Sequence, residues 1–332
     1  MNQFVRANRR RWVIIATPIL LLLASLYGLV AGSVSISVSE VWNALTVSDQ
    51  PLYRQIIFDL RLPRVLLGIL VGACLATAGA LLQGVMRNPL ADPGIIGVSA
   101  GGGVAAILIM VVLPQFGYLL PVASFLGAFI TSLLIYILAW DKGATPVKII
   151  LAGVAVNALL GAVTNGLMNF YSDRVQAVLP WLAGGLNGRS WSHLEFMAPY
   201  AIIGLLLSLF AIKPANLLLL GDDVAQLLGQ KVELQRLLII VLASLLAGAA
   251  VSVAGLVGFV GLVVPHAVRL LIGEDYRFLL PVSMVAGGAL VVFADTIARS
   301  WFDPIELPVG ILLACIGAPF FLFLLKKRGR SI

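Results

Sequence analysis

The chain is 332 residues long, and 61% of its residues are apolar while only 11% are charged. A soluble protein of this length carries about a quarter charged residues and usually divides into two domains, so the composition excludes an ordinary soluble enzyme. The charges stand at the ends of apolar runs of roughly 17 to 25 residues, long enough to cross a hydrocarbon core of about 30 Å as helices. We therefore predict an all-α, polytopic membrane protein that forms a single transmembrane domain over residues 1–332.

Ten membrane spans are predicted along the chain. The first is interpreted as a retained span, because its apolar run is too long for the core of a signal peptide. Between Leu237 and Ile272 one nearly uncharged stretch must hold two short spans, and Gly255 is the predicted turn between them. The predicted spans cover residues 13–31, 64–84, 94–113, 119–140, 149–168, 196–212, 237–254, 256–272, 279–298 and 307–325.

The basic residues predict the orientation of these spans. Most of the 22 Lys and Arg residues fall in segments that share a side with the N-terminus, and such residues favour the cytoplasmic side of a membrane. Both termini are therefore predicted to be cytoplasmic. The net charge of +7 follows from the same bias, so no nucleic-acid partner is predicted.

Small residues recur every four positions along the second span. A smooth stripe of this kind lets helix backbones approach closely in lipid, where apolar side chains gain nothing from association. The stripe, which predicts a compact bundle, consists of Gly68, Gly72, Ala76, Ala80 and Gly84.

The sequence lacks the motifs that would supply energy or catalysis. No Gly-x-x-x-x-Gly-Lys-[Ser/Thr] segment occurs, so the chain has no P-loop for nucleotide phosphates. The spans hold almost no ionisable groups, whereas carriers driven by ion gradients use buried polar sites. Asp295 is the one candidate carboxylate, and its place four residues before Arg299 favours a structural pair. Cys74, Cys315 and His266 lack metal-ligand spacing, so neither a metal nor a cofactor is predicted.

Several short motifs stand at the ends of spans or between them. They read Leu60-Arg-Leu-Pro-Arg64, Arg87-Asn-Pro-Leu-Ala-Asp-Pro-Gly94, Gly97-Val-Ser-Ala-Gly-Gly-Gly103, Gly258-Phe-Val-Gly-Leu-Val-Val-Pro-His-Ala-Val-Arg269, Ala294-Asp-Thr-Ile-Ala-Arg299 and Glu306-Leu-Pro-Val-Gly310. In this order and spacing, from about Arg61 to the C-terminus, the chain resembles the FecCD-type permease family of bacterial ABC importers for iron–siderophores, haem and cobalamin. The motifs are specific for the family and say little about the substrate.

The resemblance implies a type II ABC importer permease fold with ten helices in each copy. It implies a dimer with an identical or sister permease, two ATPase subunits on the cytoplasmic side, an extracytoplasmic substrate-binding protein and a location in the bacterial inner membrane. The chain would then be a transport subunit and not an enzyme. The segment from Trp181 to Trp191 is most similar to the ferric-siderophore branch, with haem or cobalamin import as an alternative. An ion-coupled secondary transporter is the alternative from a different class.

Three arginines match external residues that in the family pair with glutamates on the two lobes of the binding protein. They are Arg61, Arg64 and Arg299. An exposed guanidinium suits bidentate recognition of a carboxylate, so docking is the prediction. Anchoring of a helix end is the alternative, because arginine serves that purpose equally well.

Residues 213–236 match the family's coupling segment, which contacts the ATPase. The pattern predicts two short helices with Asp222 or Asp223 as a cap. An apolar face on a helix too short to span the membrane needs a partner surface, whereas a helix lying on the bilayer usually carries more Lys and Arg. The residues predicted to contact the ATPase are Leu217, Leu220, Gly221, Asp222, Val224, Leu227, Leu228 and Gly229.

Two further sites follow from the resemblance. The loop of Asn88, Pro89, Leu90, Ala91, Asp92 and Pro93 matches the cytoplasmic gate, and its two prolines fix φ and stiffen it. A plain tight turn explains the prolines equally well. The predicted lining of the pathway is Asn157, Gly161 and Asn165, on one face of the fifth span, because asparagine is costly in lipid. A hydrogen bond from Asn157 to a neighbouring helix is the alternative.

Overall fold

The computed structural model describes residues 3–32, 34, 36–46, 51–141, 143–302 and 305–328. Helices dominate this part of the chain, and no strand occurs in it. A membrane favours this outcome, because a helix satisfies every backbone polar group within one segment. The predicted all-α class is therefore confirmed.

Each of the ten predicted spans contains a helix. Among the described residues, seven helical segments are long and apolar enough to cross a membrane, and three shorter apolar ones cover Val98–Val112, Val260–Ile272 and Val309–Leu322. The helices at these positions are α1 (Gln3–Val30), α4 (Leu62–Val85), α5 (Val98–Ile107), α6 (Leu120–Leu138), α7 (Pro146–Phe170), α9 (Trp191–Phe210), α12 (Val232–Ala254), α13 (Val260–Ile272), α14 (Tyr276–Ser300) and α15 (Val309–Arg328).

Short helices connect or extend these spans. Two of them are π-helical turns, one leading into α4 and one continuing α5. They are α2 (Val38–Thr46), α3 (Pro51–Arg54), η1 (Gln55–Arg61), η2 (Pro93–Ile96), η3 (Leu108–Val112), η4 (Pro114–Leu119), η5 (Ser172–Arg174), α8 (Val175–Ala183), α10 (Ile212–Leu218) and α11 (Asp222–Leu227).

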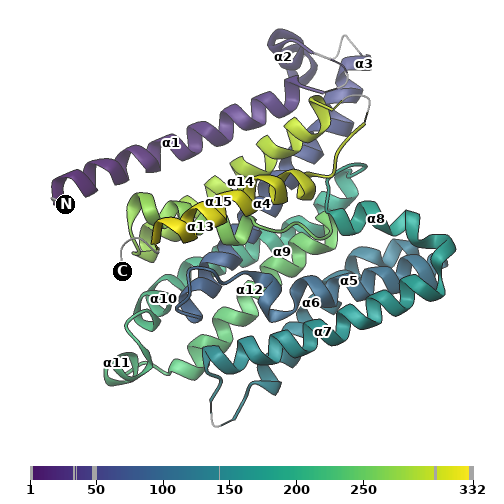
Figure 1. Ribbon diagram of the computed structural model, residues 1–332. Coiled ribbons are helices and arrows are strands. Elements are labelled where there is room, and N and C mark those ends of the chain that lie inside the picture. The colour runs from purple at the N-terminus through teal and green to yellow at the C-terminus, as the bar shows by residue number, and fades with distance from the viewer. Residues whose placement is uncertain are drawn as a thin grey trace.

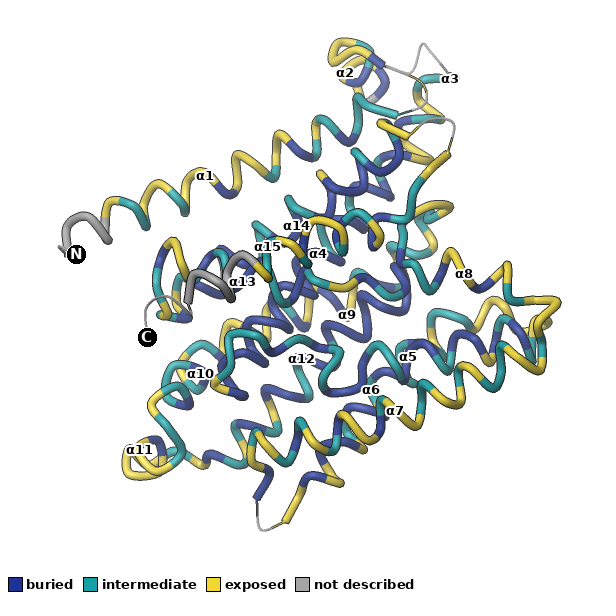
Figure 2. Tube along the Cα trace, in the orientation of Figure 1, coloured by how far each residue is buried: buried dark blue, intermediate teal, exposed yellow. Residues whose placement is uncertain are grey.

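Helix α4 forms the centre of the bundle. It packs against α14, α12 and α13, while α1 packs on α14 and α6 on α12 (Figure 1). The tube in Figure 2 is buried along α4, whereas α1 and α7 consist mostly of exposed and intermediate residues. The beginning of α1, α10 and α11 lie at one end of the bundle, named here the α11 end; α2, α3 and α8 lie at the other, the α2 end.

The small-residue stripe of α4 faces α14. A Cβ built on Gly72 would lie 2.1 Å from the carbonyl oxygen of Gly287, and a Cβ on Gly287 would lie 2.3 Å from that of Gly72. On another face of α4, a Cβ on Gly79 would meet the carbonyl oxygen of Gly261 in α13 at 1.9 Å. Only glycine permits such contacts, so the close backbone packing predicted from the stripe is confirmed.

The turn between the seventh and eighth spans lies at Gly255, as predicted, but α13 begins at Val260 and not at residue 256. Gly255 has a φ of 70°, and a Cβ there would lie 2.2 Å from the carbonyl oxygen of Trp181. The chain beyond Gly255 thus runs against the end of α8 before a helix can form. Helix α8 itself was not predicted, because it lies between the fifth and sixth predicted spans.

Glycine backbones join α8, α12 and α15 at this place. The N–H of Gly185 donates to the carbonyl of Ala254 at 2.8 Å, and the N–H of Gly310 donates to that of Gly184 at 3.0 Å. Irregular backbone inside a membrane protein is tolerated where such internal bonds satisfy it. The junction therefore permits α12 and α15 to begin or end within the protein.

Candidate functional sites

The three predicted docking arginines converge at the α2 end, where they line a cavity of about 380 Å³. Arg61 donates to the carbonyl oxygens of Leu29 and Val30, at 2.6 and 2.8 Å, and to that of Val34. Arg299 donates to the carbonyl of Gly28. The last carbonyls of a helix lack intrahelical partners, so both arginines cap the end of α1.

Arg64 makes the strongest ionic contacts of this group. Its Nε and one terminal nitrogen donate to the two carboxylate oxygens of Asp295, at 2.8 and 3.1 Å, and its other terminal nitrogen donates to Glu306 at 3.0 Å. The nearest ionic contact of Arg299 to Asp295 is 3.9 Å. The principal partner of Asp295 is therefore Arg64 on α4, and the predicted pairing with Arg299 is the weaker contact.

The expectation of exposed guanidinium groups is wrong. Arg61, Arg64 and Arg299 are 4%, 9% and 6% exposed, respectively. Their partners lie on α1, on α14 and before α15, and together they tie these segments to α4. The alternative interpretation, anchoring of a helix end, fits Arg61 and Arg299 directly. Docking by these residues stays a prediction.

The coupling segment contains the two predicted short helices, α10 and α11. Its apolar side chains divide between the interior and the surface. Leu218 and Ala225 are buried, whereas Leu227 is 87% exposed and Leu220, Val224 and Leu228 are also exposed. Leu217 is half-buried. Exposed apolar side chains gathered within nine residues, on and beside a short helix, are typical of a protein–protein contact.

Glycines shape both ends of α11. Gly221 precedes the helix with a φ of 101°, and Gly229 follows it with a φ of 79°. No side chain caps α11 at its N-terminus, so the predicted cap by Asp222 or Asp223 is wrong. The carboxylate of Asp222 is engaged elsewhere.

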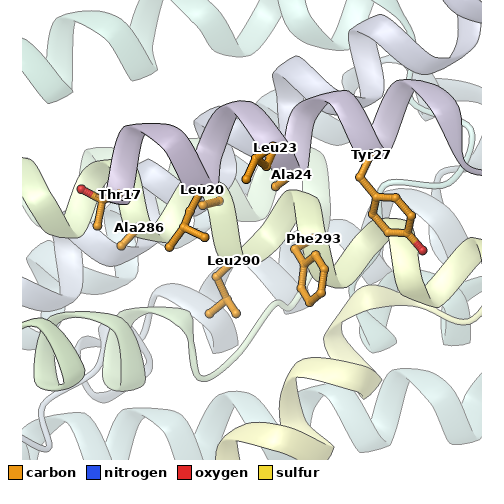
Figure 3. Close-up of a pocket in the computed structure, with 9 residues that line it drawn as sticks. Thr17, Leu20, Leu23, Ala24, Tyr27, Ala286, Leu290 and Phe293 are labelled. Carbon is orange, nitrogen blue, oxygen red and sulfur yellow. The ribbon is translucent and has the colours of Figure 1, made fainter. Parts of the chain in front are cut away.

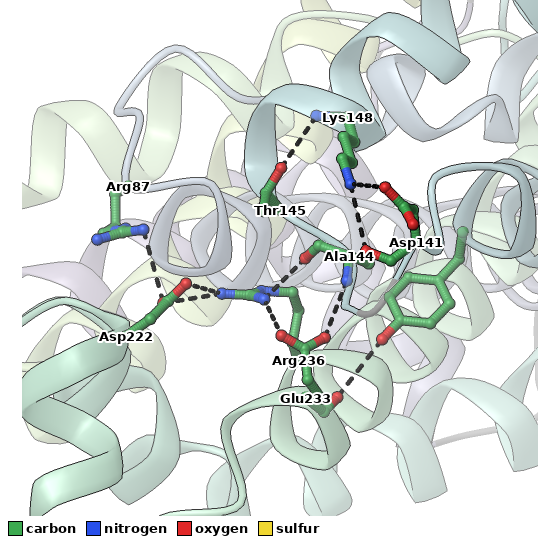
Figure 4. A network of polar contacts seen from close by, with 9 residues as sticks. Arg87, Asp141, Ala144, Thr145, Lys148, Asp222, Glu233 and Arg236 are labelled. Carbon is green, nitrogen blue, oxygen red and sulfur yellow. Dashed lines mark hydrogen bonds and ion pairs between the residues drawn. The ribbon is translucent and has the colours of Figure 1, made fainter.

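Asp222 belongs to an ionic network that joins it to Arg87 and Arg236 (Figure 4). Both of its oxygens accept from Arg236 at 2.8 Å, and one lies 3.5 Å from Arg87. Arg236, which is 1% exposed, also donates to Glu233 at 2.8 Å and to the carbonyl of Ala144 at 2.7 Å. A buried arginine with several acceptors holds α11, α12 and the α6–α7 loop together.

Sequence reasoning did not assign a role to Arg87, Glu233 or Arg236. The spacing of Glu233 and Arg236, three residues apart on one helix, is a signal of an ion pair. The contacts of Asp222 with Arg87 and Arg236 have no such signal, because they depend on how the coupling segment folds back on the bundle.

The predicted gate loop follows a strained residue and is held by local bonds. Arg87 has a φ of 48°. Asn88 accepts from the N–H of Leu90 at 2.9 Å, and Asp92 accepts from the N–H of Gly94 at 2.8 Å. Burial raises the pKa of the Asp92 carboxyl, although the bond from Gly94 opposes that shift. Pro93 packs within 3.0 Å of a Cβ built on Gly261, so the loop rests on the start of α13.

The predicted pathway residues differ in their surroundings. Asn157 donates from Nδ2 to the carbonyl of Gly94 at 3.0 Å, which confirms the alternative of a bond to a neighbouring element. Nearby, a Cβ on Gly153 would lie 2.1 Å from the carbonyl oxygen of Ile95, so α7 packs tightly against η2. A Cβ on Gly161 would have no neighbour within 4 Å, and Asn165 is exposed. The second half of this face is open in the described chain.

A bundle of about ten apolar helices of these lengths is that of a polytopic membrane protein. The chain belongs to the FecCD transport family, whose profile matches residues 20–327. This family assignment confirms the predicted resemblance.

Individual relatives cover nearly the whole chain. It is 41% identical over 327 residues to the Fe(3+)-citrate import system permease protein YfmD of Bacillus subtilis, covering 98% of each chain. It is 44% identical over 297 residues to the cobalamin import system permease protein BtuC of Halobacterium salinarum, covering 86% of this chain and 80% of the relative.

A solved structure agrees with the fold. An inward-facing ABC transporter assigned to the metal-chelate type superposes with a TM-score of 0.85 and 32% sequence identity, covering 96% of this chain and 99% of that one. The chain is thus a permease of the ABC importers for iron chelates, haem or cobalamin.

Proposed function

We propose that this permease carries a ferric siderophore or a related iron chelate from a binding protein into the bacterial cytoplasm. A second permease, identical or a sister, completes the pathway, and two separate ATPase subunits supply the energy. The observation that carries the proposal is the exposed apolar surface of Leu220, Val224, Leu227 and Leu228, on and beside α11, in a chain that has no P-loop. The Trp181–Trp191 segment and the iron-citrate relative favour an iron chelate over haem or cobalamin.

Docking of an ATPase on α11 gives the exposed leucines a purpose. Leu227 is 87% exposed, which is unfavourable in water and favourable in an apolar groove of a partner. The same end of the bundle holds the basic beginning of α1, so we assign it to the cytoplasm. The C-terminus is assigned to the same side.

The ionic network offers a route from the ATPase to the gate loop. Asp222 is the first residue of α11 and contacts Arg87, which directly precedes Asn88 of the loop. Arg236 fixes the other side of Asp222. A displacement of α11 by the ATPase would therefore reach the loop through the Asp222–Arg87 contact, while Arg236 would keep α11 attached to α12.

The open half of α7 is the proposed lining of the pathway. Gly161 and Asn165 have free space beside them in one chain, and a second permease facing them would enclose a polar channel. We assign residues 1–332 to one transmembrane domain, in which residues 213–236 serve as the coupling segment.

The arginines of the α2 end contribute to docking of the binding protein in an indirect way. Arg61 and Arg299 fix the end of α1, and Arg64 orients Glu306, whose side chain is 37% exposed. The cavity that they line also contains Arg189, which has no carboxylate partner in the described chain. The cluster therefore places positive charge beneath the surface, and this charge attracts acidic residues on an approaching partner.

Transport by the reconstituted importer tests the proposal. Proteoliposomes containing the permease with its ATPase and binding protein should take up a ferric siderophore only with ATP on the cytoplasmic side, and uptake should persist when ionophores collapse proton and sodium gradients. Haem and cobalamin should compete poorly. Loss of uptake under ionophore with ATP present would identify a secondary carrier instead. Stronger uptake of haem or cobalamin than of the ferric siderophore would show that the proposed cargo is wrong.

A further inference from the structure

Three arginines surround a cavity of about 660 Å³ at the α11 end, apart from the sites described above. They are Arg9 and Arg10 on α1 and Arg269 near the end of α13. Arg9 and Arg10 each donate one bond to a carbonyl of the last turn of α13, Leu270 at 3.2 Å and Ile272 at 3.3 Å. Since a guanidinium has five N–H donors, most of their donors remain available.

The charge of this cavity is not balanced by the protein. No carboxylate lies within ion-pair distance of Arg9, Arg10 or Arg269 in the described chain, and Arg269 bonds to the neutral side chain of Gln83 at 2.8 Å. Two acidic residues also line the cavity. Asp275 is paired with Arg277 at 2.9 Å, so Glu274 alone opposes the three arginines. The cavity therefore favours an anionic group.

An apolar groove of about 480 Å³ lies farther along α1, between α1 and α14. Figure 3 shows Thr17, Leu20, Ala24 and Tyr27 of α1 facing Leu290 of α14, beside Ala286 and Phe293. Only 11% of the apolar window of α1 is buried by the rest of the chain. The groove consequently opens toward the hydrocarbon of the membrane and not toward water.

Helix geometry aligns the two features. Arg10, Thr17 and Ala24 are spaced by seven residues and so share one face of α1. The guanidinium of Arg10 stacks on Phe278 of α14, 4.1 Å from the ring centroid, and the groove continues between the same two helices. Thr17 lies about 10 Å beyond Arg10, and Thr17 to Tyr27 spans about 15 Å. The distance from Thr17 to Tyr27 is therefore half the thickness of a hydrocarbon core of about 30 Å.

We propose that α1, α13 and α14 form a binding site for one anionic phospholipid. Its phosphate lies against Arg9, Arg10 and Arg269, and one acyl chain fills the groove from Thr17 to Tyr27. Basic pockets at the membrane surface between helices recognise lipid headgroups in this way. The site is independent of the cargo, because it requires only that α1 lies in the membrane.

Lipid binding to the purified full-length chain tests the site directly. Native mass spectrometry in detergent should show one retained phosphatidylglycerol that binds about tenfold more tightly than phosphatidylcholine with the same acyl chains. Inorganic phosphate in hundredfold excess should not displace it. Equal binding of the two lipids, or displacement by inorganic phosphate, would overturn the proposal without any variant being needed.

Two variants separate the headgroup from the acyl chain. Arg9→Gln with Arg10→Gln retains a donor for each α13 carbonyl but removes the charge, and should reduce phosphatidylglycerol binding to the level of phosphatidylcholine. The matched control, Lys213→Gln with Lys231→Gln, removes two exposed charges at the same end and should leave the binding of both lipids unchanged. Unchanged phosphatidylglycerol binding in the arginine variant would overturn the headgroup site.

Ala289→Trp fills the groove. This substitution should weaken the binding of both lipids several-fold while preserving the preference for phosphatidylglycerol. Val163→Trp, on the exposed face of α7, is the control for adding a tryptophan to a surface of the bundle. If the Ala289 variant binds both lipids as tightly as the wild type, the acyl chain does not occupy this groove.

Discussion

At the α2 end, charged side chains turn into the protein, whereas at the α11 end apolar side chains turn out of it. Arg61, Arg64 and Arg299 are nearly fully buried, and their guanidinium groups cap α1 or bind carboxylates. Leu227 and Leu228 are exposed. The two ends thus reverse the usual distribution of polar and apolar groups at a protein surface.

The buried arginines and the exposed leucines have different energetic consequences. Burying a charge is costly unless the charge is paired and hydrogen-bonded, so the arginine cluster is a rigid structural element that holds α1, α4 and α14 together. Exposing leucine is also unfavourable, and no contact within the described chain compensates for Leu227. The arginines of the α2 end are thus satisfied within one chain, whereas the exposed leucines of α11 support the proposed contact with an ATPase.

The largest effect is expected from Arg64→Ala. The substitution leaves the Asp295 carboxylate buried without its bidentate partner, and breaking a buried pair in this way costs about 3–5 kcal/mol. Thermal unfolding of the purified protein in detergent measures the loss. Arg277→Ala, which removes an arginine whose side chain is 73% exposed, should leave the unfolding temperature near that of the wild type.

A double substitution sharpens this test. Arg64→Met with Asp295→Leu removes both charges and should recover part of the stability, because apolar residues of similar volume often replace a buried ion pair without loss. A stable Arg64→Ala variant that binds the binding protein weakly would contradict the structural role and restore direct docking by this arginine.

The second prediction concerns the exposed leucines. Leu227→Asp with Leu228→Asp should reduce the ATPase that co-purifies with the permease at least about tenfold, since it places two charges in an apolar contact. The unfolding temperature of the permease should not change, because neither leucine is buried in the chain. Gln226→Asp adds one charge to an exposed position of the same helix and serves as the control. Normal co-purification of the leucine variant would exclude α11 as the docking surface.

The third prediction concerns the contact between Arg87, next to the gate loop, and Asp222 of α11. Arg87→Gln breaks the 3.5 Å contact with Asp222. Because the side chains of Arg87 and Asp222 are 40% and 27% exposed, the free energy of unfolding should change by less than about 1 kcal/mol. Transport per ATP hydrolysed should nevertheless fall several-fold, because α11 would no longer move the loop. Uptake and ATP hydrolysis are measured in the same proteoliposomes.

Lys148→Gln provides the comparison for that experiment. It breaks another ion pair with a partly exposed cation, to Asp141 at 2.8 Å, away from the loop of Asn88–Pro93. It should leave the ratio of transport to ATP hydrolysis unchanged. The same ratio in the Arg87 variant and the wild type would rule out this route.

The sequence predicts those features that depend on local composition. Apolar runs locate the ten helices, the glycines of α4 predict its close packing, and Gly221 separates α10 from α11. Features that depend on distant segments were not predictable. Arg64 and Asp295 are 231 residues apart in the chain, so no spacing rule pairs them, and α8 forms where its backbone meets Gly255 and Gly310.

Exposure is the property that sequence reasoning judged least well. Proximity to a span end suggested exposed arginines, but only the packing of α1 against α4 and α14 determines whether a guanidinium reaches water. The predicted apolar face of the coupling segment rested on different reasoning, from short amphipathic helices. Leu220, Val224, Leu227 and Leu228 are exposed as that pattern suggests, whereas Leu217 is half-buried.

The smallest effect is expected on α7, where two asparagines on one face have different surroundings. Asn157→Leu removes the donor to the Gly94 carbonyl at 3.0 Å and should cost about 1 kcal/mol of stability. Asn165 is exposed, so Asn165→Leu should leave the unfolding temperature unchanged. Because an apolar side chain would replace a polar one in the proposed pathway, transport should fall a few-fold at an unchanged rate of ATP hydrolysis.

The opposite face of α7 supplies the control for this last prediction. Val163 is exposed and lies about 160° around the helix from Asn165, so Val163→Ala changes a surface outside the proposed pathway. It should leave both transport and stability at wild-type values. If Asn165→Leu also transports at the wild-type rate, the open half of α7 faces lipid or the second permease and not the cargo. If instead both variants lose transport equally, α7 acts through packing, and neither face is the pathway.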